Sequence, residues 1–307
     1  MVNGTDSPAE NLTGHNESVE IFVQFMNYFV LIFGTFINLL SLWIRYLEKR
    51  NLSGSIFIVS LEISNIFSII SVCTHIFYRF SKYCRFFYFM MYTSQSFTPI
   101  FLVLYTIERW LIISWPLKVE YYMSEKMTWL ISLSVVIAVP SINCLSLIER
   151  QYDNFNCNPG PNFVFIGEIV YSFLLPGIAL MFDLLLARNL MSLSNMKTFE
   201  ESEMQLESRK KQSKSATKAI ITTSLYIALT SILAGVLYII YQNELKNYTP
   251  DRLERYYRMR DINDVLREFA MTRFYVTFII YYATLYEFRN KVQKIFKKSA
   301  PKMSMDE

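Results

Sequence analysis

The chain has 307 residues, of which only 18% are charged and 16% are aromatic, and its formal net charge is +4. Its apolar content of 52% excludes a disordered chain, and its composition is not that of a collagen, a coiled coil or a disulfide-rich scaffold. The small net charge and the dispersed Lys and Arg residues argue against nucleic-acid binding.

The most prominent feature is a series of long apolar stretches, at 22–46, 55–78, 86–114, 127–148, 162–187, 218–242 and 269–288. Each reaches or approaches the roughly 20 residues that cross the hydrocarbon core of a bilayer as a helix. The stretches are continuous, whereas the strands of a membrane β-barrel alternate in hydrophobicity. We therefore expect an all-α membrane protein whose seven-transmembrane helix bundle occupies residues 22–288. The last stretch is the weakest, because Arg273 lies inside it.

The first 21 residues form a polar tail that we expect to be extracellular. The tail carries three glycosylation sequons, which begin at Asn3, Asn11 and Asn16. Lys and Arg residues close to the apolar stretches favour the side opposite this tail, as they do in cytoplasmic loops. Together these patterns predict a multi-pass protein of the plasma membrane with its N-terminus outside. Asn247 then lies in the third outer loop, as a fourth candidate for glycosylation.

Three further polar regions stand out. Residues 188–217 are predicted to form an inner loop with an acidic half followed by a basic half. Residues 244–268 are predicted to form a long outer loop in which the run from Thr249 to Asp251 begins a solvated helix, a possible extension of the last span. Residues 289–307 contain a short amphipathic helix, which we expect to rest on lipid at the inner leaflet, and a cytoplasmic tail.

The end of the third stretch carries the most informative motif. Glu108, Arg109 and Trp110 are followed by Pro116 and Leu117, and this run resembles the Asp/Glu-Arg-Tyr motif and the Pro-Leu pair of rhodopsin-like (class A) G-protein-coupled receptors. The resemblance implies that the acid holds the Arg at rest and that the released Arg contacts a heterotrimeric G protein. The alternative is an interfacial ion pair that only ends a helix.

Cysteine positions extend the resemblance. Cys84 lies 25 residues before Arg109, as the third-span cysteine of the family does, and Cys157 falls in the second outer loop. The family pattern implies a disulfide between them on the oxidising side of the membrane. Cys73 and Cys144 are expected to be buried free thiols.

Other landmarks match or depart from the same family. The run from Phe173 to Pro176 resembles the fifth-span motif whose proline permits a bulge, and Tyr286 resembles the tyrosine that ends the seventh span. The family's second-span Asp is replaced by Asn65, which removes a sodium site, and residues 218–242 contain no proline. Such departures are typical of a divergent invertebrate peptide or chemosensory branch.

The ligand pocket that the resemblance implies is found by counting from these landmarks. Met91 takes the place of the Asp that amine receptors use, and residues 269–288 contain no Lys for an opsin Schiff base. Glu168 and Arg273 either contact ligand or pair with each other structurally, and Arg273 has the further alternative of snorkelling to the interface. The expected lining residues are His75, Met91, Tyr92, Gln95, Glu168 and Arg273.

We therefore expect a receptor that binds an extracellular ligand and activates a heterotrimeric G protein. A small peptide is favoured by the charged 244–268 segment, and a chemosensory or odorant receptor for a small molecule is the alternative. A more distant alternative is a seven-span transporter or channel subunit whose path is lined by Glu62, Asp183 and Arg273. The sequence contains no nucleophile–base pair or metal-ligand pattern, so neither an enzyme nor a cofactor or metal is expected.

Overall fold

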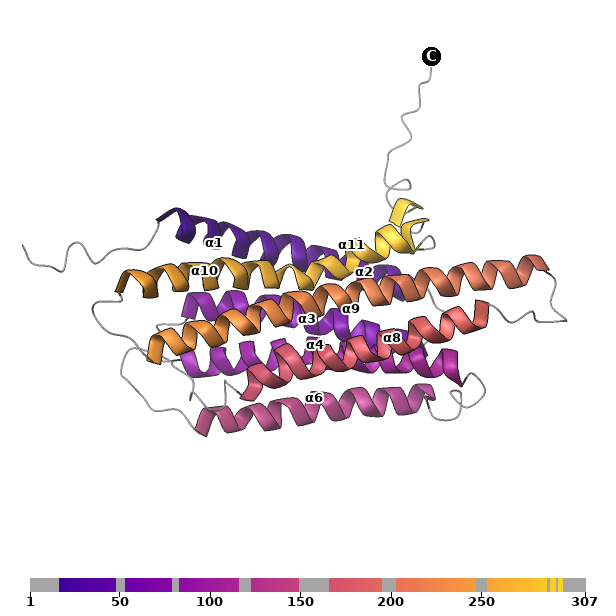
Figure 1. Ribbon diagram of the computed structural model, residues 1–307, viewed down its shortest axis with the longest axis horizontal. Coiled ribbons are helices and arrows are strands. Elements are labelled where there is room, and N and C mark those ends of the chain that lie inside the picture. Colours follow the sequence, from indigo (N-terminus) through magenta and orange to yellow (C-terminus); the bar gives the residue numbers. More distant parts are fainter. Residues whose placement is uncertain are drawn as a thin grey trace, which may run out of the picture.

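The computed structural model shows a bundle of long helices lying side by side (Figure 1). The residues that it describes are 17–47, 53–78, 83–115, 123–148, 166–194, 203–246, 253–285, 288–290 and 292–294. All regular structure within these ranges is helical. Continuous apolar runs with few glycines favour this result, since a helix satisfies its backbone polar groups internally. The all-α class predicted from the sequence is confirmed.

The first half of the chain supplies four helical rods. The first consists of α1 (Glu17–Phe29), the π-helix η2 (Val30–Gly34) and α2 (Thr35–Leu47). It is followed by α3 (Ser53–Tyr78), α4 (Cys84–Ser114) and α6 (Glu125–Ile148). These bounds agree closely with the first four predicted stretches. Pro99 and Pro140 lie inside α4 and α6 without ending them.

The second half supplies three more rods within the described ranges. They are the π-helix η3 (Ile169–Leu174) with α8 (Leu175–Ser194), then α9 (Glu203–Lys246), then α10 (Leu253–Met271) with α11 (Arg273–Thr284). The predicted inner loop at 188–217 is largely wrong, because α8 continues to Ser194 and α9 already begins at Glu203. The helix predicted within 244–268 is confirmed by α10, but its expected solvation is wrong, because most of its described side chains are half-buried and Glu268 is fully buried.

Six segments are long and apolar enough to cross a membrane: Ser18–Tyr46, Ile56–Thr74, Phe86–Ser114, Glu125–Cys144, Ile166–Asn189 and Thr217–Asn243. The rod formed by α10 and α11 differs from them, because α10 is strongly charged and α11 has only 12 residues. Nevertheless this rod packs against α9, the first rod and α3. Within the described ranges, the bundle therefore contains six candidate membrane spans of a membrane protein and a seventh rod packed against them.

The bundle has its polar side chains inside and much of its apolar surface outside. Leu184 and Ile32 are 72% and 70% exposed, whereas Asn65 and Ser94 are buried at the centre. Thr98 of α4 donates to the Asn65 side chain of α3 over 3.1 Å, and Ser68 donates to the Ser94 carbonyl over 2.8 Å. An apolar exterior around a hydrogen-bonded polar interior is what lipid as the surrounding solvent requires.

The two cysteines outside the implied disulfide differ in burial. Cys73 is buried, as predicted. Cys144 is exposed, so the prediction for it is wrong. Position 144 lies in the last turn and a half of α6, a helix whose outer face is exposed along much of its length. Cys157 and the side chain of Cys84 lie outside the described residues.

Candidate functional site

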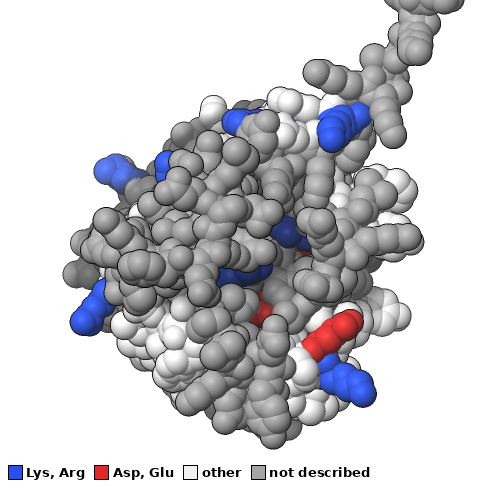
Figure 2. All heavy atoms as spheres, turned by 90° about the vertical axis from the view of Figure 1, so that its right-hand side faces the viewer, with Lys and Arg blue, Asp and Glu red and all other residues white. Residues whose placement is uncertain are grey.

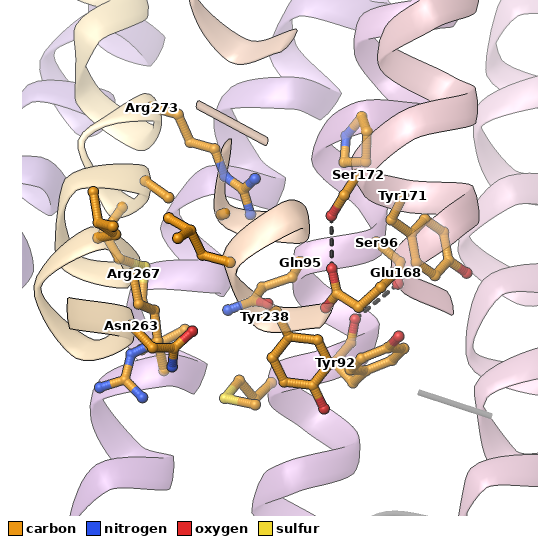
Figure 3. A pocket seen from close by; sticks show the side chains of 18 of the residues that line it. Tyr92, Gln95, Ser96, Glu168, Tyr171, Ser172, Tyr238, Asn263, Arg267 and Arg273 are labelled. Atoms are coloured by element: carbon orange, nitrogen blue, oxygen red, sulfur yellow. Dashed lines mark hydrogen bonds between the residues drawn. The ribbon is translucent and has the colours of Figure 1, made fainter. Parts of the chain in front are cut away.

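A cavity of about 270 Å³ lies between the rods at one end of the bundle (Figure 3). We call this end, at which α4 begins and α9 finishes, the cavity end; it is the left-hand end in Figure 1. The wall is built from α3, α4, the η3 region, α9, α10 and α11, and its lining residues are Val72, Tyr88, Met91, Tyr92, Gln95, Ser96, Pro99, Glu168, Tyr171, Ser172, Ala234, Leu237, Tyr238, Asn263, Leu266, Arg267, Ala270, Met271 and Arg273.

The wall formed by the fifth rod is shaped by its π-helix. Pro176 has no backbone N–H, so the turn before it cannot complete the regular α pattern, and η3 ends two residues earlier. This agrees with the bulge expected from the run Phe173 to Pro176. The neighbouring α9 approaches η3 closely at Gly235, where an added Cβ would lie 2.7 Å from the Cβ of Ser172. The glycine thus sets how near these two walls stand.

Glu168 carries the negative charge of the cavity. It immediately precedes η3, and its carboxylate accepts a hydrogen bond of 2.7 Å from the hydroxyl of Ser172, one helical turn later. Figure 3 shows this carboxylate pointing into the space between the helices. The hydrogen bond from Ser172 therefore holds an acidic group at the cavity surface.

Arg273 carries a positive charge on the opposite wall. Its guanidinium donates to the Ser231 hydroxyl of α9 over 3.0 Å and lies 5.1 Å from the ring centroid of Phe274. Its Nε is buried and has no hydrogen-bond partner among the described residues. The backbone break at Thr272, whose hydroxyl also contacts the hydroxyl of Tyr226, starts the new helix α11 at this arginine.

Glu168 and Arg273 share the cavity without forming an ion pair within the described part of the chain. Each is nevertheless an electrostatic neighbour of the other. In Figure 3 the two side chains reach inward from different sides. The alternative in which Glu168 and Arg273 form a structural ion pair with each other is therefore not seen among the described residues. The cavity has room between one negative and one positive group.

A second arginine at the cavity, Arg267, is already neutralised. Its guanidinium lies 3.5 Å from the carboxylate of Asp264 and 3.3 Å from that of Glu268. Glu268 is fully buried, while the side chain of Arg267 is about half exposed. The charge of Arg267 is thus paired with acidic side chains of its own helix, α10.

Tyrosine rings provide most of the aromatic surface of the cavity. Tyr92 stacks on Tyr88, with centroids 6.1 Å apart, and meets the edge of Tyr171 at the same separation. The hydroxyl of Tyr238 accepts a hydrogen bond of 3.0 Å from Gln242. Such rings offer apolar faces together with polar hydroxyl groups.

Five of the six predicted pocket residues line this one cavity: Met91, Tyr92, Gln95, Glu168 and Arg273. The side chain of His75 lies outside the described residues. The prediction missed Tyr88, Tyr171, Tyr238, Asn263 and Arg267. For Tyr88 the signal was present, since it precedes Tyr92 by four residues and shares its helical face. The others required knowledge of how η3, α9 and α10 face α4.

The opposite end, which we call the Arg109 end, contains the Glu108–Arg109 pair. Glu108 is fully buried, and neither carboxylate oxygen accepts a hydrogen bond from the described residues. Arg109 lies over the ring of Tyr105, 5.3 Å from its centroid, and no ion pair joins it to Glu108 within the described ranges. Trp110 instead packs against Phe182 of α8. Pro116 and Tyr286 lie outside the described residues.

Figure 2 looks onto the Arg109 end. Lys and Arg side chains lie around its rim, and basic and acidic side chains are visible inside a hollow. Beyond α11, Phe288 and Val292 belong to helical turns whose side chains are buried in the main hydrophobic cluster. Of the segment 289–307, residue 291 and residues 295–307 are outside the described ranges, as are the four sequon asparagines.

Glu62, for which the sequence offered only a path-lining alternative, has a structural partner. Its carboxylate accepts hydrogen bonds from Arg45 over 2.7 Å and from Ser41 over 2.5 Å. The Arg45 guanidinium also lies 5.2 Å from the ring centroid of Tyr281. Asp183 is buried beside Ser224 of α9.

The described residues contain no group of three His, Cys, Asp or Glu side chains that could hold a metal ion. No protein-family model and no curated protein matches the chain.

Proposed function

We propose that the chain is a divergent rhodopsin-like G-protein-coupled receptor of the plasma membrane, with its N-terminus and its cavity end outside. It binds an extracellular ligand in the cavity and activates a heterotrimeric G protein at the Arg109 end. The observation that carries the proposal is the cavity lined by five residues whose positions follow from the receptor resemblance. Peptide and small-molecule ligands both remain compatible with this proposal.

The rod of α10 and α11 is proposed as the seventh span. Asn38 of α2 donates to the Phe274 carbonyl of α11 over 2.7 Å, and Tyr281 of α11 is buried beside Arg45. These contacts support a position for α11 inside the bundle rather than on its surface. On this proposal the charged helix α10 forms the outer mouth of the cavity.

The same helices run from the cavity to the Arg109 end, which provides a physical route for signalling. A ligand that binds two arrangements of the rods with different affinity shifts their populations. In α4 the cavity residue Gln95 and the inner residue Arg109 belong to one continuous helix. A rearrangement of the rods that opens the inner hollow exposes Arg109 of α4 to a partner protein.

The test is G-protein activation in cells that express the wild type or Arg109→Ala at equal surface levels. We expect basal or ligand-stimulated signalling in the wild type and a loss of at least tenfold in the variant. Lys126→Ala is the control, because Lys126 is an exposed basic residue near the same end. Equal signalling by wild type and Arg109→Ala contradicts the assigned role of Arg109. Transport of a solute without any G-protein signal favours the transporter alternative.

A further inference from the structure

The cavity contains two opposite charges that do not neutralise each other. The Glu168 carboxylate is held by Ser172, and the Arg273 guanidinium by Ser231, so each is fixed to its own wall. No ion pair joins them among the described residues, and the Nε of Arg273 is buried without a hydrogen-bond partner. Charges removed from water are costly unless they are paired, so a ligand that brings a counter-charge to each wall lowers this cost.

We propose that the cavity binds a small zwitterion, with an ammonium group at Glu168, a carboxylate at Arg273 and an aromatic body against the tyrosines. This inference deepens the proposed function, on which it rests, by naming the class of ligand. The compounds that fit are aromatic amino acids and short peptides with free termini that contain one aromatic residue.

Charge sign disfavours ligands that carry a single charge. An anion without a positive group would be attracted by Arg273 but repelled by Glu168 in the same cavity. A cation without a negative group would be attracted by Glu168 but repelled by Arg273. Arg267 does not change this balance, because Asp264 and Glu268 already pair with it. A ligand with both charges, placed at its two ends, satisfies both walls.

Size and lining agree with this class. The cavity of about 270 Å³ lies near the lower end of the roughly 300–1,000 Å³ range of ligand pockets. It suits one or two residues rather than a long peptide. The rings of Tyr88, Tyr92, Tyr171 and Tyr238 can stack on an aromatic body, or on its edge.

The experiment measures binding directly on the purified full-length chain in lipid nanodiscs. The probes are free Phe and Tyr and a panel of dipeptides that each contain one Phe or Tyr, followed by the N-acetylated and C-amidated form of every binder. We expect at least one free probe to raise the midpoint of thermal unfolding. Calorimetry should then show that removing either terminal charge weakens binding by roughly tenfold to hundredfold, the range of one charge-assisted hydrogen bond.

Variants assign each end of the probe to one residue. Glu168→Gln should bind the free and the N-acetylated probe with about equal affinity. It should still bind a free carboxylate more tightly than an amidated one. Arg273→Gln should lose only the carboxylate preference, and Arg273→Lys should retain part of it if the glutamine variant does not fold. Arg258→Gln is the matched control, since Arg258 is an exposed arginine of α10 that does not line the cavity, and this variant should keep both preferences.

Any one of three results overturns the proposal. No free probe stabilises the wild type, or a bound probe keeps its affinity after both N-acetylation and C-amidation, or Glu168→Gln changes the preference for a free over an amidated carboxylate. Because binding is measured without a G protein, failures are distinguishable. A chain that binds the zwitterion but does not signal refutes the receptor function alone. A chain that signals but ignores every zwitterion refutes this ligand class alone.

Discussion

Two regions of the molecule hold an acid and an arginine inside the bundle, and they differ in one respect. Toward the Arg109 end, Arg45 and Glu62 touch at 2.7 Å, and Ser41 donates to the same carboxylate oxygen. At the cavity end, Glu168 and Arg273 each contact a serine but not each other. We call Arg45 and Glu62 the closed pair, because their side chains are in direct contact. We call Glu168 and Arg273 the open pair, because the cavity lies between them.

The difference teaches how to distinguish a structural charge from one available to a ligand. The two members of a buried ion pair in direct contact neutralise each other, and losing one member leaves the other charge stranded. Charges that are fixed separately at a cavity keep the capacity for another partner. Stability measurements on the two regions should therefore diverge, and four predictions test this divergence in order of size.

The largest effect is expected from breaking the closed pair. Glu62→Ala leaves the buried Arg45 without its counter-charge and should cost about 3–5 kcal/mol of stability. Thermal and denaturant unfolding of the purified chain in detergent measures the change. The double substitution Arg45→Met with Glu62→Leu removes both charges and should recover a large part of the loss. If the double variant is as unstable as Glu62→Ala, stranded charge is not the cause.

A second, smaller loss is expected where two walls of the cavity approach. Gly235→Ala places a Cβ against Ser172 and should destabilise the fold by roughly 1–3 kcal/mol through overpacking. The control is Gly177→Ala in α8, where an added Cβ meets nothing within 4 Å. That control should gain roughly 0.5–1 kcal/mol from better helix propensity. The same unfolding assay reports both, and equal effects would contradict the packing argument.

A third effect concerns the tie that positions α11. Asn38 donates to the carbonyls of Phe274 and Gly34, over 2.7 and 2.8 Å. Asn38→Ala should cost about 0.5–1.5 kcal/mol for each hydrogen bond lost. Ser134→Ala, which removes an exposed hydroxyl bonded only within its own helix, should change stability by less than about 0.5 kcal/mol. An Asn38 variant as stable as this control would show that α11 is held by apolar packing alone.

The smallest effect is expected at the open pair. Glu168→Gln keeps an oxygen that accepts from Ser172 and removes a charge that has no ionic partner in the described structure. Its stability should remain within about 1 kcal/mol of the wild type, because the lost charge–serine interaction is offset by lower desolvation. Glu62→Gln, measured alongside, should be clearly less stable. A severe loss of stability in Glu168→Gln would show that the charge of Glu168, like that of Glu62, is needed for folding.

Several features of the fold were predictable from local sequence. The first four spans are bounded within a few residues because a run of about 20 apolar residues has few ways to satisfy its backbone in lipid. The π-helix before Pro176 was expected for the same kind of local reason, the missing N–H. The helix within 244–268 followed from its start signal and its spaced charges.

Other features were not predictable, since they depend on which residues meet across helices. Nothing near Glu62 in sequence identifies Arg45, 17 positions earlier, as its partner. The exposure of Cys144 depends on which face α6 turns outward. The helical start of α9 at Glu203 was missed because its charges resemble those of a loop.

The amino-acid sequence by itself determined an all-helical membrane protein, since hydrophobic length and backbone satisfaction are properties of single segments. It also placed Met91, Tyr92, Gln95, Glu168 and Arg273 on one candidate pocket. Only the tertiary structure decided that Glu168 and Arg273 stay apart while Arg45 and Glu62 close. That outcome depends on the spacing and rotation of packed helices. Gly235 lets α9 approach η3 closely, and Thr272 separates α10 from α11 just before Arg273.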